Sequence, residues 1–576
     1  MKKKQILPVL IIISLILLIV LFMVGSKLLE KYTPTDERTD LTEYYNLTQD
    51  SQVAIILNHA VYEGYATIIE DDIYLDYHFV HDILNSRFYW DANENIFLYT
   101  TAEDVISAHA DATRYTIGKS SEDYGRTIVK ASAQSAWIHL DFVKQYSDFT
   151  FSEYDAPNRL VINNEWKEIT VSTLKKNTEV REKGGIKSPI LTDVKKGDIL
   201  TILETDETWT KVCTADGVIG YVKSNLVKNT TIQNLTSEFE PETFHHLLSD
   251  KSVSLLWHPV YNKSGNDDIS SVLAETKGVT VICPSWFKLK DNKGNLISYA
   301  SNDYVNYCHN QNIEVWGMVK NMDLESEDID INYILTHTSV RQNLVNQIVS
   351  LALQYNLDGI NIDFEQLSES EIGDGYIQFL RELSVKCENN DIVLSTAVYM
   401  PAAYNKVYRY GEQADFVDYI ALMAYDQHYG QQSGEGSVAS LDWVEEGVNN
   451  TIAEGIPAEQ ILLGVPFYTR LWKLTPTSDE SATELTYQIT RENLGLTSGK
   501  RWMENNIAEP QWLEDCGQWY GELEKDNVIY KMWLEDGDSI GQKLQLLKEY
   551  SLGGAAFWSS ALDNTSIWEV VIKYVN

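Results

Sequence analysis

Positively charged residues are scarce in this chain of 576 residues. It has 46 Lys and Arg against 84 Asp and Glu, which gives a formal net charge of −38. A protein this acidic is repelled by phosphate polymers, so the composition argues against a nucleic-acid-binding protein. Net charge bears on solubility and on partners, and it does not determine the fold.

Cysteine is also sparse. The five are Cys213, Cys283, Cys308, Cys387 and Cys516, and none lies close enough to another to form a metal knuckle. An odd, scattered set gives no disulfide framework. We therefore interpret most of them as small buried hydrophobic residues, and we expect no metal site.

The remaining composition is that of a globular protein. Hydrophobic residues make up 44% and charged residues 23%, which excludes a mostly disordered or collagen-like chain. The length predicts about three or four domains. The 15 Trp and 34 Tyr suit stacking on flat, polar-edged ligands such as sugars, although these rings often belong to a core.

An almost unbroken apolar run extends from Ile6 to Gly25, directly after Lys2, Lys3 and Lys4. Its length predicts a transmembrane helix at 6–25. The lysines favour a cytoplasmic segment at 1–5 and an extracellular location for the rest of the chain. A cleaved signal peptide is the alternative, but the run exceeds the usual apolar core and no A-x-A-like site follows it. A buried core helix fits poorly because the run has no polar face.

A polar linker at 26–45 leads to an imperfect repeat at 46–165. One copy contains Phe88-Tyr-Trp-Asp91 and Ile96-Phe-Leu98, and the other contains Phe149-Thr-Phe-Ser-Glu-Tyr-Asp155 and Leu160-Val-Ile162. Each copy predicts two short strands around a turn. The segment resembles the small α+β module at the N-terminus of copper amine oxidases. It has no His cluster typical of copper, and we interpret it as a stalk module.

Residues 167–229 are rich in short β-strands. Turn signals such as Lys196-Gly197-Asp198 and Asp216-Gly217 separate the strands, which predicts a small barrel. The stretch resembles bacterial SH3 domains, and the resemblance implies binding to cell-wall peptide or polymer. The alternative is a domain that only packs beside its neighbour.

The segment 230–576 predicts an α/β fold, a (β/α)8 TIM barrel. Near-continuous apolar runs are typical of parallel strands that are covered on both faces. Amphipathic helical stretches separate them. Strands seven and eight are far apart, so we expect a small inserted lobe within 468–553. The eight runs are 253–260, 279–287, 313–319, 359–364, 392–398, 417–425, 461–467 and 554–560.

The fourth run carries a polar ladder. Because side chains alternate along a strand, Asn361, Asp363 and Glu365 should line the barrel interior and rise to its mouth. Active sites of such barrels lie at the C-terminal ends of the strands. Three polar interior positions are costly unless they are paired or functional. The alternative is a purely structural polar network.

The ladder resembles the signature D-G-x-D-x-D-x-E of glycoside hydrolase family 18, with Asn361 in place of the middle Asp. Further motifs follow in the family's order. The resemblance implies a chitinase-like barrel of the spore-germination and cell-wall branch. The further motifs are Met423-Ala-Tyr425-Asp426, Gly464-Val-Pro-Phe-Tyr468-Thr-Arg470 and Gly553-Gly-Ala-Ala-Phe-Trp558.

Two carboxyls on one strand face approach a sugar from the same side, so Asp363 is poorly placed to attack from the far face. The resemblance implies a substrate-assisted, retaining mechanism, with Glu365 as the general acid, Asp363 orienting the N-acetyl group and Tyr425 hydrogen-bonded to it. Asp426, Tyr468 and Arg470 would support or contact the sugar. Trp558 would be the stacking floor, or alternatively a core residue. No metal or organic cofactor is needed.

We therefore expect a membrane-anchored extracellular glycosidase that cleaves N-acetylglucosamine-containing glycan, with peptidoglycan favoured by the anchor and the SH3 domain. The alternative function is a lectin-like cell-wall protein without activity. Chitin or an N-glycan is the alternative substrate. The expected partners are this glycan, a wall polymer or peptide at the SH3 domain, and the membrane through the N-terminal helix.

Overall fold

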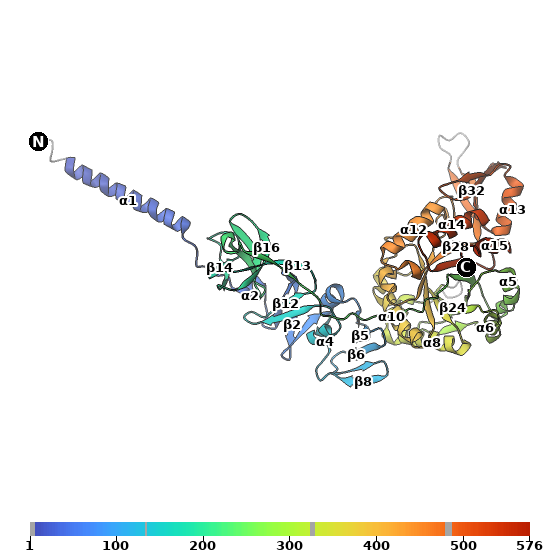
Figure 1. Ribbon diagram of the computed structural model, residues 1–576, viewed down its shortest axis with the longest axis horizontal. Coiled ribbons are helices and arrows are strands. Elements are labelled where there is room, and N and C mark those ends of the chain that lie inside the picture. Colours follow the sequence, from blue (N-terminus) through green and yellow to red (C-terminus); the bar gives the residue numbers. More distant parts are fainter. Residues whose placement is uncertain (1–5, 133–134, 323–328, 478–485, 576) are drawn as a thin grey trace. The chain divides into compact units, whose positions relative to one another are not determined.

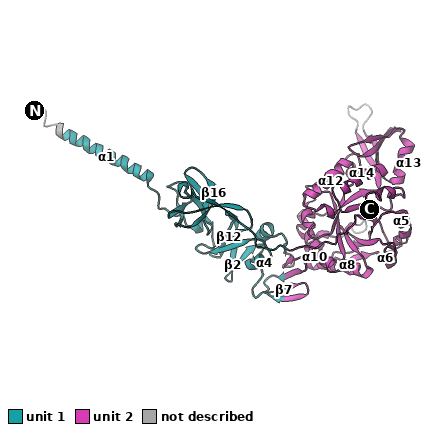
Figure 2. Ribbon diagram, viewed as in Figure 1, with its two compact units in different colours: residues 1–90, 108–115, 122–241 teal, residues 91–107, 116–121, 242–576 magenta. Residues whose placement is uncertain are grey.

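The computed structural model describes residues 6–132, 135–322, 329–477 and 486–575. The chain divides into two compact units (Figure 2). The first comprises 1–90, 108–115 and 122–241, and the second comprises 91–107, 116–121 and 242–576. Lys2, Lys3 and Lys4 lie outside the described residues.

The first unit begins with one long apolar helix, α1 (Ile6–Tyr32) (Figure 1). An 18-residue window within Pro8–Tyr32 has a mean hydropathy of 3.2 and is not buried in the protein, so α1 is long and apolar enough to cross a membrane. The helix runs seven residues beyond the predicted end at Gly25, because Ser26-Lys-Leu-Leu-Glu-Lys-Tyr32 continues it without Gly or Pro.

The stalk module contains a seven-stranded sheet of order β11-β12-β1-β2-β3-β10-β9. Strand β1 pairs with β12 in parallel, and its other neighbour β2 is antiparallel. The strands are β1 (Gln52–Leu57), β2 (Ala60–Ile69), β3 (Asp72–Asp76), β9 (Val129–Ala131), β10 (Ala136–His139), β11 (Thr150–Tyr154) and β12 (Arg159–Asn163).

Five further strands, β4 to β8, lie between β3 and β9 in the chain. They are β4 (Phe88–Asp91), β5 (Ile96–Thr100), β6 (Val105–His109), β7 (Arg114–Ile117) and β8 (Ser120–Asp123), and the short helix α4 (Leu140–Gln145) follows β10. The predicted strand pairs at 88–98 and 149–162 are present. The likeness of the module to copper amine oxidases stays a prediction.

A second seven-stranded sheet, of order β15-β14-β18-β17-β16-β13-β19, is antiparallel throughout. Its core contains Val180, Leu200, Val212 and Val222, which are all buried. The strands are β13 (Glu168–Thr173), β14 (Thr178–Arg181), β15 (Ile190–Val194), β16 (Ile199–Thr205), β17 (Trp209–Cys213), β18 (Ile219–Lys223) and β19 (Thr230–Asn234).

The second unit is built on a closed parallel barrel, as predicted. Its eight strands pair in chain order, and the last pairs with the first. A Cβ on Gly554 would lie 2.0 Å from the Val253 carbonyl oxygen, so the closing contact requires a glycine. The strands are β20 (Val253–His258), β21 (Val281–Pro284), β24 (Glu314–Lys320), β25 (Gly359–Asp363), β26 (Val393–Tyr399), β27 (Tyr419–Met423), β28 (Ile461–Pro466) and β34 (Gly554–Trp558).

Alternate residues of these strands face two different layers. Ile360, Ile362 and Phe364 are fully buried in the outer layer, among the side chains of the surrounding helices. Trp257 and Trp316 belong to a separate cluster that fills the barrel interior. The helices include α5 (Ile269–Glu275), α6 (Asn302–His309), α8 (Thr338–Tyr355), α10 (Gly375–Glu388), α12 (Leu441–Ala453), α14 (Gly537–Glu549) and α15 (Trp568–Val571).

Between β28 and α14 lies an inserted lobe. It is a five-stranded sheet of order β30-β29-β33-β32-β31 with one helix, and residues 478–485 within it are outside the described part. Its elements are β29 (Tyr468–Pro476), β30 (Tyr487–Gly495), α13 (Leu496–Asn506), β31 (Gln511–Leu513), β32 (Gln518–Lys525) and β33 (Val528–Leu534).

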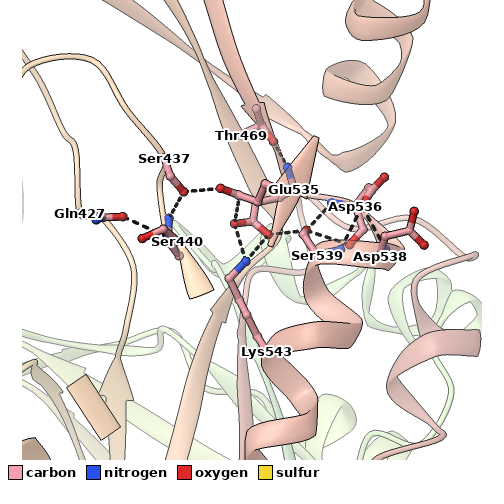
Figure 3. Close-up of polar contacts among 11 residues, drawn as sticks. Gln427, Ser437, Ser440, Thr469, Glu535, Asp536, Asp538, Ser539 and Lys543 are labelled. Carbon is pink, nitrogen blue, oxygen red and sulfur yellow. Dashed lines mark hydrogen bonds and ion pairs between the residues drawn. The ribbon is translucent and has the colours of Figure 1, made fainter. Parts of the chain in front are cut away.

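A buried ion pair attaches this lobe to the barrel (Figure 3). Glu535, directly after β33, accepts two hydrogen bonds of 3.0 Å from Lys543 on α14, and both side chains are buried. The backbone N–H of Glu535 donates to Thr469 of β29. Burial raises the pKa of Glu535, whereas Lys543 and Ser539 act in the opposite direction. Leaving either charge unpaired would be costly, so the pair fixes the inner face of α14.

Candidate active site

A hollow of about 180 Å³ lies at the C-terminal ends of the barrel strands. It is the site expected from the polar ladder, because it contains Asp363 and Glu365. It is formed by residues of six of the eight strands, by residues just after β25 and β27, and by Tyr468, the first residue of β29. Its walls are Trp257, Met318, Asp363, Glu365, Ala397, Tyr399, Met423, Tyr425, Asp426, Tyr468 and Trp558.

Glu365, two residues beyond β25, is held at both its backbone and its carboxylate. Its N–H donates to Asn321 Oδ1 at 2.8 Å, and its carbonyl accepts from Asn321 Nδ2 at 2.8 Å. Tyr399, the last residue of β26, donates its hydroxyl hydrogen bond to Glu365 Oε2. The carboxyl group therefore has a fixed direction into the hollow.

Asp363 is 8% exposed and has a strongly shifted pKa. Burial and the nearby Glu365 carboxylate raise the pKa of Asp363 to about 8, and Lys320 acts in the opposite direction. At neutral pH the empty site therefore favours a protonated Asp363. Among these influences burial is the largest.

Asn361 is fully buried below the hollow and does not line it. Its Oδ1 accepts from Trp257 Nε1 at 3.2 Å, and its Nδ2 donates to Ser395 Oγ at 2.9 Å. These bonds join β25 to β20 and β26 across the interior. The residue therefore supports the floor of the hollow, and a direct sugar contact is not part of this arrangement.

Tyr425 and Trp558 both contribute to the walls of the hollow. Burial raises the pKa of the Tyr425 hydroxyl well above its usual value, and the nearby Tyr468 raises it further. The hydroxyl therefore stays neutral and able to donate a hydrogen bond. Trp558 is half-buried and meets Trp257 with ring centroids 5.8 Å apart at 61°. Its place on the wall of the hollow fits a stacking surface.

Asp426 is oriented by two residues of β29. Tyr468 donates its hydroxyl to Asp426 Oδ1, and Arg470 Nη2 lies 2.5 Å from the same oxygen. Arg470 also donates to the His428 carbonyl and does not line the hollow. Asp426 has a φ of +67°, a strained value that these contacts hold in place. Arg470 is thus a supporting residue of the site.

Comparison with known families decides what kind of site this is. The family "Glycosyl hydrolases family 18" matches residues 259–563, more than half of the chain. The chain belongs to glycosyl hydrolase family 18. It is a glycosidase with a chitinase-like barrel. Residues 176–228 match the bacterial SH3 domain, which confirms that prediction.

Relatives and solved structures agree with a family 18 barrel. The chain is 22% identical to the uncharacterized glycosylase YvbX of Bacillus subtilis over 49% of this chain and 81% of the relative. It is 24% identical to the cortical fragment-lytic enzyme of B. subtilis, over 49% of this chain and 65% of the relative. The solved C-terminal domain of a chitinase candidate from Desulfitobacterium hafniense is matched over its full length and 57% of this chain, with 18% identity and a TM-score of 0.50. This likeness shows the fold.

Sequence reasoning missed several residues of the family 18 site. Tyr399 and Asn321 carry no recognisable motif, although each lies at or just after the C-terminal end of a barrel strand, where such sites form. Trp257 lies in the first apolar run, where the sequence does not distinguish it from a core residue. Within the described residues, no group of three or more His, Cys, Asp or Glu side chains could hold a metal ion.

Proposed function

We propose that the chain is a membrane-anchored extracellular hydrolase of N-acetylglucosamine-containing glycan, with peptidoglycan as its substrate. The main observation that supports this reaction is that Asp363, Glu365 and Tyr425 line the same hollow. The SH3 domain and the cortical fragment-lytic enzymes among the relatives favour a wall glycan. The apolar helix α1 supports the anchor, with the lysines that precede it in the cytoplasm.

The proposed reaction begins with proton transfer from Glu365 to the leaving glycosidic oxygen. The carbonyl oxygen of the substrate's own 2-acetamido group attacks the anomeric carbon as the glycosidic bond breaks, and a cyclic oxazolinium forms. Water then attacks the same carbon, and Glu365 takes its proton. Two displacements at one carbon give a product of retained configuration. Family 18 is among the exceptions to the usual pair of flanking carboxyls.

Asp363 balances the charge of this intermediate. In the empty site its raised pKa favours the protonated form. The proton of Asp363 passes to Glu365, which delivers it to the leaving oxygen. The positive charge that develops on the acetamido group then stabilises the ionised form of Asp363, since an opposite charge nearby lowers a carboxyl pKa. Asp363 can then accept the amide hydrogen bond, while the neutral hydroxyl of Tyr425 donates to the acetamido oxygen. Trp558 supports the sugar ring from below.

One comparison of substrates tests this proposal. The full-length protein is incubated with purified peptidoglycan, chitin oligomers and an N-glycosylated protein, and released fragments are identified by mass spectrometry. We expect new reducing ends from peptidoglycan, with Glu365→Gln reducing their release by about 10²–10⁴-fold. Cleavage of chitin or glycoprotein alone would contradict the substrate assignment. Full activity of Glu365→Gln would contradict the role of the acid.

The membrane topology has a separate test. Protease is added to intact cells whose outer wall has been removed, and the barrel is followed by immunoblotting. We expect the barrel to be digested while a fragment containing α1 stays with the membrane. A protected barrel, or a barrel free in the medium without residues 1–25, would contradict the anchor.

A further inference from the structure

A second hollow lies on the second unit and shares no lining residue with the catalytic one. This outer groove has a volume of about 510 Å³. It is formed where strands β31 and β32 of the lobe, helix α14 and the C-terminal residues after α15 come together. Its principal side chains are Trp512, Trp519, Asp538, Gln542, Gln545 and Tyr574.

Two tryptophans form the aromatic part of the outer groove. Trp512 and Trp519 are direct partners across β31 and β32, with ring centroids 5.3 Å apart at 69°. Both are half-buried, so part of each ring stays open to solvent. Trp519 Nε1 donates to Asp538 Oδ2 at 3.2 Å, which fixes the direction of its indole. A ligand that stacks here meets a ring that is already in position.

Helix α14 supplies the polar part of the outer groove. Its inner face carries Lys543, which the buried Glu535 holds, whereas Asp538 points away from that pair (Figure 3). Gln542 and Gln545 follow Asp538 at intervals of four and three residues, and all three are exposed. The start of the helix is fixed by a capping box between Asp536 and Ser539. The two amide groups are thus presented on a rigid helix.

The chemistry of these side chains selects the ligand. Indole faces beside side-chain amides suit the apolar face of a pyranose ring and its hydroxyl or acetamido groups. One acid, Asp538, and one base, Lys573, line the groove, so their formal charges cancel. The net charge of −38 repels anionic polymers. An uncharged stretch of sugar strand satisfies all of these conditions.

We propose that the outer groove is a second binding site for an N-acetylglucosamine-containing strand, which keeps the polymer on the protein while the catalytic hollow cleaves it. The identity of the strand rests on the proposed function, and the groove itself does not. A weak second contact joined to the first raises the effective concentration of polymer at the active site.

Gly541 provides a matched pair of variants. A Cβ at this position would contact only Val570 Cγ1 at 3.5 Å and Tyr574 Oη at 3.8 Å within 4 Å. Gly541→Ala should therefore fit, and Ala favours a helix interior more than Gly does. Gly541→Gln carries a longer side chain that must enter the groove. Trp512→Ala instead removes one ring, and Lys548→Ala, on an exposed part of α14 outside the groove, is the surface control.

The test measures retention of the full-length protein, in detergent, on purified insoluble peptidoglycan and separately on chitin. All variants also carry Glu365→Gln so that the polymer stays intact. We expect Gly541→Gln and Trp512→Ala to weaken retention at least tenfold on one or both polymers, while Gly541→Ala and Lys548→Ala match the parent. The polymer on which retention falls is the one whose sugar strand binds in the outer groove. Thermal unfolding checks that each variant is folded.

Retention that is unchanged in folded Gly541→Gln and Trp512→Ala would overturn the second site. A parallel fall in hydrolysis of a soluble tetrasaccharide, measured in the Glu365 background, would show that the substitutions damage the catalytic hollow, and would also overturn it. If peptidoglycan is retained through the groove but never cleaved, the proposed function fails and the second site stands. If peptidoglycan is cleaved and its retention does not change in the groove variants, the proposed function stands and the second site fails.

Discussion

Tyr399 donates a hydrogen bond to the carboxylate of Glu365 from the neighbouring barrel strand. The parallel register of β25 and β26 pairs Ile362 with Thr396, so three residues further along the two side chains lie opposite each other at the mouth. The hydroxyl is a reliable donor, because burial and the Glu365 carboxylate raise the pKa of Tyr399 far above neutrality. This contact fixes the oxygen that must deliver a proton.

Tyr399→Phe should impair the proton transfer while leaving the hollow intact. A hydrogen bond to a charged group contributes about 1.5–3 kcal/mol, so kcat should fall by roughly 10- to 100-fold with little change in KM. Steady-state kinetics from pH 4 to 10 measure both. A change in KM alone would contradict this positioning role.

The stability of Asp363→Asn, compared with that of the wild type, should increase as the pH rises. Asp363 has a folded pKa of about 8 against an ordinary value of 3.8. Between these values the folded state binds more protons than the unfolded state, so this group's stabilising contribution is complete below about pH 4 and is lost as pH rises through 8. Asn imitates the protonated acid and does not titrate.

The difference in melting temperature, Asp363→Asn minus wild type, should therefore increase from pH 4 to pH 8 and then stay level. Differential scanning calorimetry over this range measures it. A difference that is constant with pH would show that Asp363 is ionised in the folded, empty site.

Asn361→Asp should move the alkaline limb of the pH profile of kcat/KM to higher pH. This parameter reports the ionisation of groups in the free protein. Burial and the Glu365 carboxylate raise the pKa of Asp363 to about 8, so the free protein loses this proton on the alkaline limb. A third carboxyl below the pair adds a like charge and raises this pKa. Ser395→Ala is the matched control, because it removes the hydrogen bond to Asn361 without adding charge. An unchanged limb in a folded Asn361→Asp would show that the two positions do not interact.

The sequence was sufficient to predict the barrel and the centre of its site. Apolar runs of strand length, such as 359–364, mark buried parallel strands. The polar ladder begins within this run at Asn361 and ends at Glu365, one residue after it. The pattern could not show which side chain of a neighbouring strand meets Glu365, because that depends on the register. Tyr399 lies one residue beyond the run 392–398, and no sequence pattern distinguishes it.

Contacts between distant parts of the chain also could not be predicted from the sequence. Asp91 accepts hydrogen bonds from the backbone N–H and the hydroxyl of Thr338, 247 residues away, at 2.7 and 2.6 Å. Glu94 accepts from the N–H and hydroxyl of Ser339 in the same way. These acids satisfy the free N–H groups at the start of α8. No local pattern predicts a helix cap that another segment supplies.

Asp91→Ala should destabilise the second unit. Asp91 is only 1% exposed, so its removal leaves the Thr338 donors buried without their partner, at a cost of about 1–3 kcal/mol. The charge also favours the positive end of the helix. Glu103→Ala is the control, because Glu103 is exposed and offers only its backbone carbonyl to Asn389. Equal melting temperatures for the two variants would show that the cap contributes nothing.

The 2-acetamido group should be the nucleophile of the first step, and a change in the substrate tests this without any mutation. Asp363 and Glu365 both enter the hollow from the C-terminal end of β25, so Asp363 is poorly placed to attack the anomeric carbon from the face opposite the acid. A glycan with a 2-hydroxyl at the reacting sugar has no internal nucleophile and should not be cleaved. A thiazoline analogue of the oxazolinium should inhibit in competition with substrate, because it resembles a species that the site binds tightly. Both are measured by release of a chromogenic leaving group from matched substrates. Efficient cleavage of the 2-hydroxyl substrate would contradict the substrate-assisted mechanism, because a protein side chain would then have to attack.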